Sequence, residues 1–186
     1  MRADCWTWAV ALVLFAPSVW GEEMQSGPDV GKKVPVLKVF AVTGELEGKD
    51  VDYTAERKKK PTIYALIRAD QWSRPMARFL KTLDKEVKKD SEDAFVVAVW
   101  LTDKHKETKE YLPRAQDSLQ FENTALSYFK GKKDGPKGWN VNSDAHITVV
   151  VVNNKKVAAR FGYLSINETE VKNVRMALKK ALKAKK

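Results

Sequence analysis

Residues 61–80, PTIYALIRADQWSRPMARFL, join two patterns that favour different secondary structures. The run 62–67 is almost entirely apolar and includes β-branched residues, which is typical of a strand buried on both faces of a sheet. After the turn, apolar residues recur with the spacing of an amphipathic helix at Met76, Phe79, Leu80, Leu83 and Val87. The stretch therefore predicts a central strand, a sharp turn at 72–76 and a helix that packs on the sheet.

Further elements extend this unit on both sides. Residues 34–42 alternate as a strand, 93–101 form a second buried strand, and 103–119 favour a helix that is kinked or ends near Pro113. We expect Asp103 to cap that helix. The segment 126–131 is ambiguous between strand and turn.

The C-terminal third predicts a β-hairpin and a helix. The runs 146–152 and 155–163 flank a turn at Asn153 and Asn154, and Asn167 with Glu170 forms a capping pair for a final amphipathic helix. Parallel central strands with an antiparallel hairpin give an α/β fold, a mixed sheet flanked by helices on both faces. We expect one domain over residues 31–186.

The N-terminus has the pattern of an export signal. Arg2 precedes a short apolar core, Pro17 interrupts it, and Gly21 marks a cleavage site, so residues 1–21 are expected to be a signal peptide and 22–30 a disordered linker. An uncleaved anchor is the alternative. The mature chain is then secreted or periplasmic, without a membrane span. Since Cys5 is the only cysteine in the sequence, the mature chain has no thiol.

The formal net charge of +10 favours weak association with polyanions. The basic runs at 57–60 and 130–133 and near the C-terminus have no aromatic residues between them, as base stacking would require. We therefore expect no specific nucleic-acid binding.

The turn at Trp72, Ser73, Arg74, Pro75 and Met76 resembles the active-site segment of thioredoxin-like redoxins, of the peroxide-reducing and cytochrome-maturation kinds. Their motif is Trp-Cys-x-Pro-Cys, so Ser73 and Met76 stand where that family has its two cysteines. The likeness covers about residues 30–184. The resemblance implies a thioredoxin-like fold whose groove binds extended peptides or proteins.

The two replacements remove the family's chemistry. A serine hydroxyl stays protonated at a helix N-terminus that would stabilise a thiolate, and a methionine cannot resolve a mixed disulfide. We expect Ser73 to accept a hydrogen bond as the helix N-cap and Met76 to pack. Redoxins also carry a cis-proline before their penultimate strand; His146 or Ile147 occupies that place here, so we expect a trans bond.

Three functions remain open. The first is a non-catalytic protein- or peptide-binding module of the cell envelope, whose groove is formed by 72–76 with His146 and Ile147. Trp72 and Trp139 are candidates to line a shared groove, but packing of tryptophans in a core or loop is the more common outcome. The second is a basic structural or polyanion-associating protein. The third is hydrolase-type chemistry in which Asp144 orients His146 toward Ser73. His105 is expected on a charged, solvated helix face. The two histidines, His105 and His146, lack the spacing of a metal site, and we expect neither metal nor cofactor.

Overall fold

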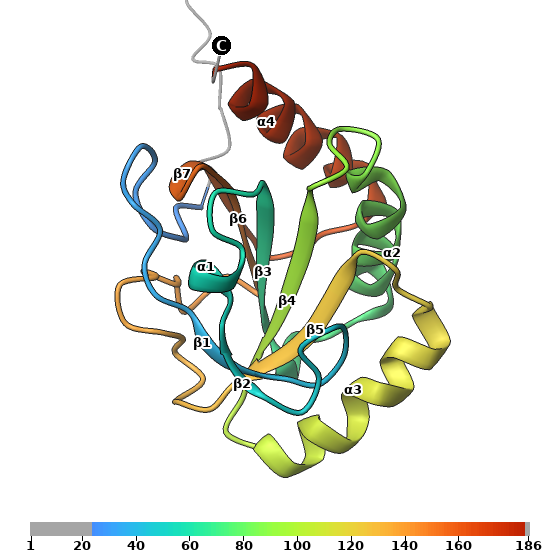
Figure 1. Ribbon diagram of the computed structural model, residues 1–186. Helices are drawn as coiled ribbons and strands as arrows, with labels where there is room; N and C mark the ends of the chain where they lie inside the picture. The colour runs from blue at the N-terminus through green and yellow to red at the C-terminus, as the bar shows by residue number, and fades with distance from the viewer. Residues whose placement is uncertain (1–23, 185–186) are drawn as a thin grey trace, which may run out of the picture.

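The computed structural model describes residues 24–184 (Figure 1). The expected signal peptide, its cleavage site at Gly21 and Cys5 lie outside the described residues. Among the helices of the described part, none has the length and apolar character needed to cross a membrane.

One seven-stranded sheet with the order β2-β1-β5-β4-β3-β6-β7 forms the centre of the molecule. The strands are β1 (Lys38–Ala41), β2 (Asp50–Asp52), β3 (Thr62–Arg68), β4 (Phe95–Leu101), β5 (Thr124–Phe129), β6 (Ile147–Asn153) and β7 (Lys156–Tyr163). Strands β3, β4 and β5 are parallel, whereas β6 and β7 add as an antiparallel hairpin beside β3. The mixed α/β sheet predicted from the sequence is confirmed, and the ambiguous segment 126–131 begins within β5 and contains its last four residues.

The three long helices cover the same face of the sheet (Figure 1). They are α2 (Arg74–Val87), α3 (His105–Leu119) and α4 (Val171–Lys183). Their apolar side chains pack with Ile63, Ala65 and Ile67 of β3 in one core. The alternate β3 side chains, Tyr64 and Leu66, belong to a second core on the other face.

The second core is covered mainly by irregular segments. Its helical cover is the one-turn helix α1 (Tyr53–Glu56), which buries Tyr53. Trp139, in the loop before β6, is fully buried in this core and donates to the Val36 carbonyl at 3.0 Å. Helices therefore lie on both faces, but very unevenly.

Helix α3 differs from its prediction at two points. It passes through Pro113, so of the two predicted alternatives, a kink or an end near Pro113, the end is wrong. Proline removes one N–H donor from a helix, and because Pro113 is exposed the freed carbonyl can bond to water. The N-cap is Lys104, not Asp103, whose carboxylate accepts the Lys133 N–H at 3.2 Å.

The expected disordered linker at 22–30 is wrong for its described part, since residues 24–30 lie against β6 and β7. The Ser26 hydroxyl is 2.5 Å from that of Thr148 and also accepts the Asn142 N–H. Arg160 donates to the Gly27 carbonyl and pairs with Asp29 at 2.8 Å. Composition alone could not reveal these partners because they lie more than a hundred residues away in sequence.

Candidate binding site at the β3–α2 turn

The site is built around the turn that connects the centre of the sheet to α2. Strand β3 ends at Arg68, and a short 3-10 helix η1 (Ala69–Gln71) reverses the chain direction before Trp72. Ser73 then starts α2 with an extended backbone at φ −145° and ψ 163°. The predicted strand–turn–helix unit is present with the boundaries that its pattern indicates.

Trp72 is held by two aromatic side chains from different elements. Its indole N–H donates to the Tyr111 hydroxyl of α3 at 2.6 Å. Its ring meets Trp100 of β4 edge-on, with centroids 5.0 Å apart and an interplanar angle of 60°. Because both the N–H and the ring of Trp72 are held in place, little side-chain entropy is lost when a ligand binds against its apolar surface.

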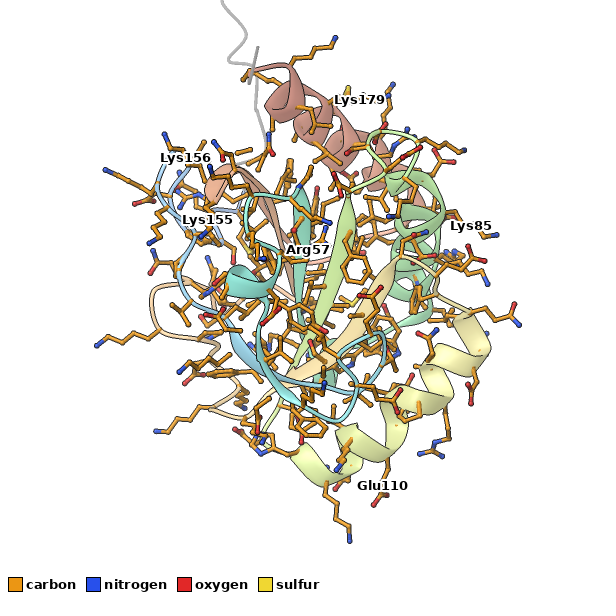
Figure 2. The ribbon with its side chains drawn as sticks, in the orientation of Figure 1. Arg57, Lys85, Glu110, Lys155, Lys156 and Lys179 are labelled. Carbon is orange, nitrogen blue, oxygen red and sulfur yellow. The ribbon has the colours of Figure 1, made fainter. Side chains whose placement is uncertain are left out.

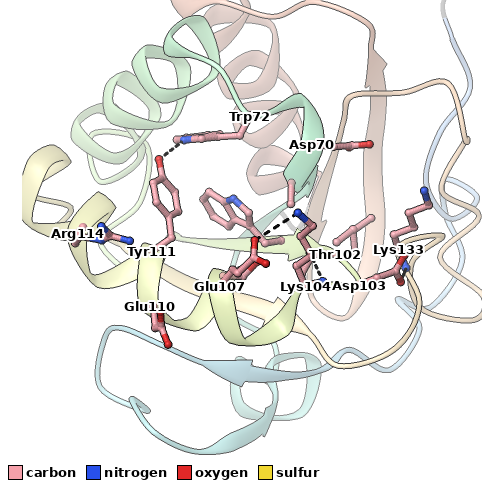
Figure 3. A pocket seen from close by; sticks show the side chains of 14 residues that line it. Asp70, Trp72, Thr102, Asp103, Lys104, Glu107, Glu110, Tyr111, Arg114 and Lys133 are labelled. Atoms are coloured by element: carbon pink, nitrogen blue, oxygen red, sulfur yellow. Dashed lines mark hydrogen bonds and ion pairs between the residues drawn. The ribbon is translucent and has the colours of Figure 1, made fainter.

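A pocket of about 730 Å³ opens beside these three aromatic residues (Figure 3). It lies where β3 and β4 end and α3 begins, and Tyr111 is 37% exposed at its rim. Charged groups of both signs surround the aromatic floor: Asp70, Asp103, Glu107 and Glu110 against Lys104, Arg114 and Lys133. An apolar floor within a mixed polar rim is typical of a binding site for a ligand with both kinds of group.

One face of the first three turns of α3 supplies much of the wall. Lys104, Glu107, Thr108, Tyr111 and Arg114 recur at helical spacing along the pocket. Lys104 and Glu107 form an ion pair at 3.5 Å (Figure 3). This face of α3 was not predicted from the sequence as part of a site. The pattern that could have indicated it is Tyr111 among charged residues at i, i+3 and i+4 spacing.

The two positions aligned with the redoxin cysteines have structural roles. Met76 is 2% exposed and packs in the core beneath α2. Ser73 is the N-cap of α2, but its side chain makes no capping hydrogen bond, so that expectation is wrong. A capping oxygen normally accepts from the second or third helical residue; the second is Pro75, which has no N–H.

The segment before β6 lies beside the end of β3, as the resemblance implied. The Arg68 N–H donates to the His146 carbonyl at 3.0 Å, and Ile147 pairs with Ile67 in the sheet register. Ile147 is completely buried, so it cannot contact a ligand. Within residues 24–184 every peptide bond is trans, which agrees with the absence of proline at this point.

The arrangement considered for hydrolysis does not form in this part of the chain. Among the hydrogen bonds of the described residues, none joins His146 to Ser73 or to Asp144. The Asp144 carboxylate instead lies 3.5 Å from the Ser143 hydroxyl. Within the described residues Ser73 therefore has no hydrogen bond to His146, the base considered for its activation.

The two tryptophans pack in separate cores, and His105 lies elsewhere than expected. Trp139 and Trp72 belong to cores on opposite faces of the sheet, so they do not share a groove. His105 is not on a solvated helix face: its ring stacks on Tyr128 with centroids 5.7 Å apart, and its Nε2 is 3.3 Å from the Gly131 carbonyl. Over residues 24–184, no cluster of three His, Cys, Asp or Glu side chains could hold a metal ion.

Of the residues predicted to form the groove, Trp72 alone lines this pocket. Arg74 is exposed, and Ser73, Pro75 and His146 are half-buried around the turn. The pocket lies toward α3 and not toward the segment 146–147. The tertiary contact between Trp72 and Tyr111 places the pocket on the α3 side of the turn.

Comparison with known proteins supports the architecture. No protein-family model matches the chain, and no curated protein matches it at a significant level. Among solved structures, the peroxidoxin BcpB of Mycobacterium tuberculosis superposes with a TM-score of 0.60 at 12% identity, over 84% of this chain and 98% of that one. The yeast mitochondrial 1-Cys peroxiredoxin gives 0.60 at 11% identity, over 84% and 78% of the two chains.

A secreted thiol-disulfide isomerase from Corynebacterium glutamicum is similar to the same extent. Its TM-score is 0.58 at 12% identity, over 78% of this chain and 84% of that protein. Similarity at such identities reflects shared architecture and not shared chemistry. Together with the mixed seven-stranded sheet, these likenesses show that the chain has the thioredoxin-like α/β fold.

Proposed function

We propose that this protein is a non-catalytic member of the redoxin group that binds an extended peptide or a partner protein of the cell envelope. The binding site is the pocket formed by Trp72, Trp100 and Tyr111. The observation that carries the proposal is the Trp72–Tyr111 hydrogen bond, which holds an aromatic wall open beside the turn that resembles the redoxin motif.

The chemistry of the pocket favours a peptide. Its floor accepts an apolar or aromatic side chain, while its acidic and basic rim can pair with backbone groups and with side chains of either charge. Buried aromatic anchors with a polar rim are where most binding energy concentrates in protein interfaces.

Thiol chemistry is not part of the proposal. The only cysteine, Cys5, falls in the segment with the pattern of a cleaved signal. Ser73 and Met76 occupy the two motif positions, and neither supplies a thiolate. The proposed recognition surface is the aromatic pocket toward α3, which does not depend on cysteines.

The proposed location in the envelope rests on the N-terminal pattern. A short apolar core with a break and a small-residue cleavage site is typical of secretory signals. The similar protein from Corynebacterium glutamicum is described as secreted, which is consistent with export. Proteolytic removal of residues 1–21 during export, read by mass spectrometry of the recovered protein, is the expected outcome.

The direct test is selection from a random-peptide library with the protein lacking residues 1–21, followed by isothermal titration of the selected peptides. Trp72→Ala should weaken binding by about 2 kcal/mol or more, roughly 30-fold, because it removes a central aromatic anchor. Tyr111→Phe should give a smaller loss, since it keeps the ring and removes only the acceptor of the Trp72 N–H.

Leu164→Ala is the matched control, because Leu164 is 55% exposed and lies outside the pocket. It should bind the selected peptides as the unaltered protein does. Selected peptides that bind equally well to Trp72→Ala, or a library that yields no saturable binder, would rule out this pocket as a peptide site.

A further inference from the structure

A second cleft lies at the other end of the sheet, where β3 begins and β6 ends. It encloses about 600 Å³ between the loop 58–61, residues Ser91 and Asp93, the turn 153–155 and Leu182 of α4. None of these residues lines the Trp72 pocket. The two clefts are therefore separate sites at opposite ends of the strands.

The cleft is strongly basic. Four of its nine lining residues are lysines, Lys58, Lys59, Lys60 and Lys155, and Asp93 is its single acidic residue. Asp93 is already paired with Lys60 at 3.1 Å. The other three lysines are exposed and form no ion pair with any residue in the range 24–184, so their charges face solvent uncompensated.

Main-chain contacts hold these lysines in two adjoining turns. The Asn154 N–H donates to the Lys59 carbonyl at 3.2 Å, which joins the loop 58–61 to the β6–β7 turn. Lys58 and Lys155 have positive φ values of 50° and 63°, so tight turns set the directions of both side chains. Charges that the fold itself brings together need less ordering when a ligand binds.

The basic surface continues beyond the cleft. Lys156 follows Lys155 at the start of β7, and its backbone bridges to Lys33. Figure 2 shows Lys155, Lys156 and Lys179 along the upper part of the molecule, whereas Glu110, from the rim of the Trp72 pocket, lies at the bottom. A ligand longer than the cleft would therefore meet more positive charge as it extends.

We propose that this cleft binds a linear phosphate-bearing polymer without nucleobases, through its phosphate groups. Three separated, uncompensated cations match a ligand with repeated negative charges better than one small anion. The large exposed hydrophobic residues of the described chain, Val30, Val36, Tyr111, Leu164 and Met176, all lie outside the cleft, so insertion into a membrane is disfavoured. No aromatic side chain lines it, so bases would find no stacking surface.

The test uses the protein lacking residues 1–21 and long-chain linear polyphosphate as the probe, titrated at several salt concentrations. The altered protein carries Lys58→Gln, Lys59→Gln and Lys155→Gln. Its affinity should fall on the order of tenfold at low salt, and the slope of log K against log salt should become less steep by about 2, at roughly 0.7 per lost phosphate contact.

A matched control removes the same charge elsewhere, with Lys106→Gln, Lys137→Gln and Lys172→Gln at exposed positions outside both clefts. This control should keep most of the polyphosphate affinity of the unaltered protein. Thermal unfolding followed by circular dichroism checks that both variants are folded. Equal losses in the two variants would overturn the proposal, because binding would then follow net charge alone.

Two further probes separate other sources of negative charge. Vesicles rich in phosphatidylglycerol, or single-stranded DNA of matched charge, should bind more weakly than polyphosphate and should depend less on the three lysines. Tighter binding of either probe at these lysines would overturn the assignment to a phosphate polymer without nucleobases. Trp72→Ala should leave polyphosphate binding unchanged, so failure here is distinguishable from failure of the peptide site.

Discussion

Two helix-capping positions behave differently although both carry a favourable residue. The Asn167 side chain accepts the Thr169 N–H at 2.8 Å and the Thr169 hydroxyl at 2.7 Å, at the start of the 3-10 helix η2 (Glu168–Glu170) that leads into α4. Ser73 occupies the same kind of position before α2 and makes no such bond. Pro75, at the second helical residue, removes one of the two donors that a cap normally uses.

This difference predicts unequal effects of the same substitution. Asn167→Ala should lower the free energy of unfolding by about 1 kcal/mol, the usual value of a lost cap. Ser73→Ala should change it by less than about 0.5 kcal/mol, as for an ordinary surface position. Urea unfolding followed by circular dichroism measures both, and a loss at Ser73 equal to that at Asn167 would show that its hydroxyl caps α2 in solution.

At the scale of elements, one carboxylate fastens α2 to the start of β5. Asp84 is 3% exposed, and its oxygens accept the Asn123 N–H and the Thr124 hydroxyl at 2.7 Å and the Glu122 N–H at 3.2 Å. These donors lie just before or at the first residue of β5, where the sheet has not yet satisfied them. The polar residue on the buried face of α2 thus determines where β5 begins.

Loss of this carboxylate should be costly. Asp84→Ala leaves buried donors unsatisfied and should destabilise the protein by about 2–3 kcal/mol. Asp117→Ala, at an exposed position of α3, serves as the control and should have little effect. Thermal unfolding of the two variants compares them directly, and similar melting temperatures would contradict the role of Asp84.

At the scale of the whole molecule, a charged network joins the C-terminal end of α2 and Asp90, just beyond it, to α4, across 85 to 89 positions of sequence. Arg175 donates two hydrogen bonds of 2.7 Å to Asp90, whose side chain is fully buried, and also pairs with Glu86. Lys179 lies 3.4 Å from the same carboxylate. Burial alone would raise the pKa of Asp90, but the hydrogen bonds and charges of Arg175 and Lys179 outweigh it and hold that pKa below the usual value of about 3.8.

The network predicts a pH dependence of stability with a definite sign. A carboxylate whose pKa is lower in the folded state stabilises the protein above its ordinary pKa, and this contribution is lost as the pH falls through the folded-state value. Urea unfolding should therefore show falling stability below about pH 4. Asp90→Asn should lose about 2 kcal/mol at pH 7 and show a shallower decline in acid.

Asp134→Asn, in an exposed loop, is the control and should keep the pH profile of the unaltered protein. If Asp90→Asn kept both the stability at pH 7 and the steep loss of stability in acid, the ion pair between Asp90 and Arg175 would contribute nothing to the docking of α4.

Much of the fold follows from local patterns. The long apolar runs at 62–67 and 93–101 correspond to the central parallel strands β3 and β4. The helical spacing of apolar residues after Ser73 corresponds to α2. These features are predictable because burial on two faces or on one helical stripe leaves a regular trace in the sequence. The packing of residues 24–30 and the continuation of α3 through Pro113 leave no such trace, since both depend on distant partners or on exposure.

The sequence by itself determined the α/β class, the turn at Trp72 and the absence of any cysteine after Cys5, because each depends on residue type and spacing along the chain. The tertiary structure decided which groups share a site. It joined Trp72 to Tyr111 rather than to Trp139, left His146 and Ser73 without a hydrogen bond between them in the described residues, and brought Lys58 and Lys59 beside Lys155. Such pairings depend on which strands are neighbours and on which face of the sheet a side chain lies. The paired residues are separated by between 39 and about 100 positions in sequence, and no local pattern indicates that they meet.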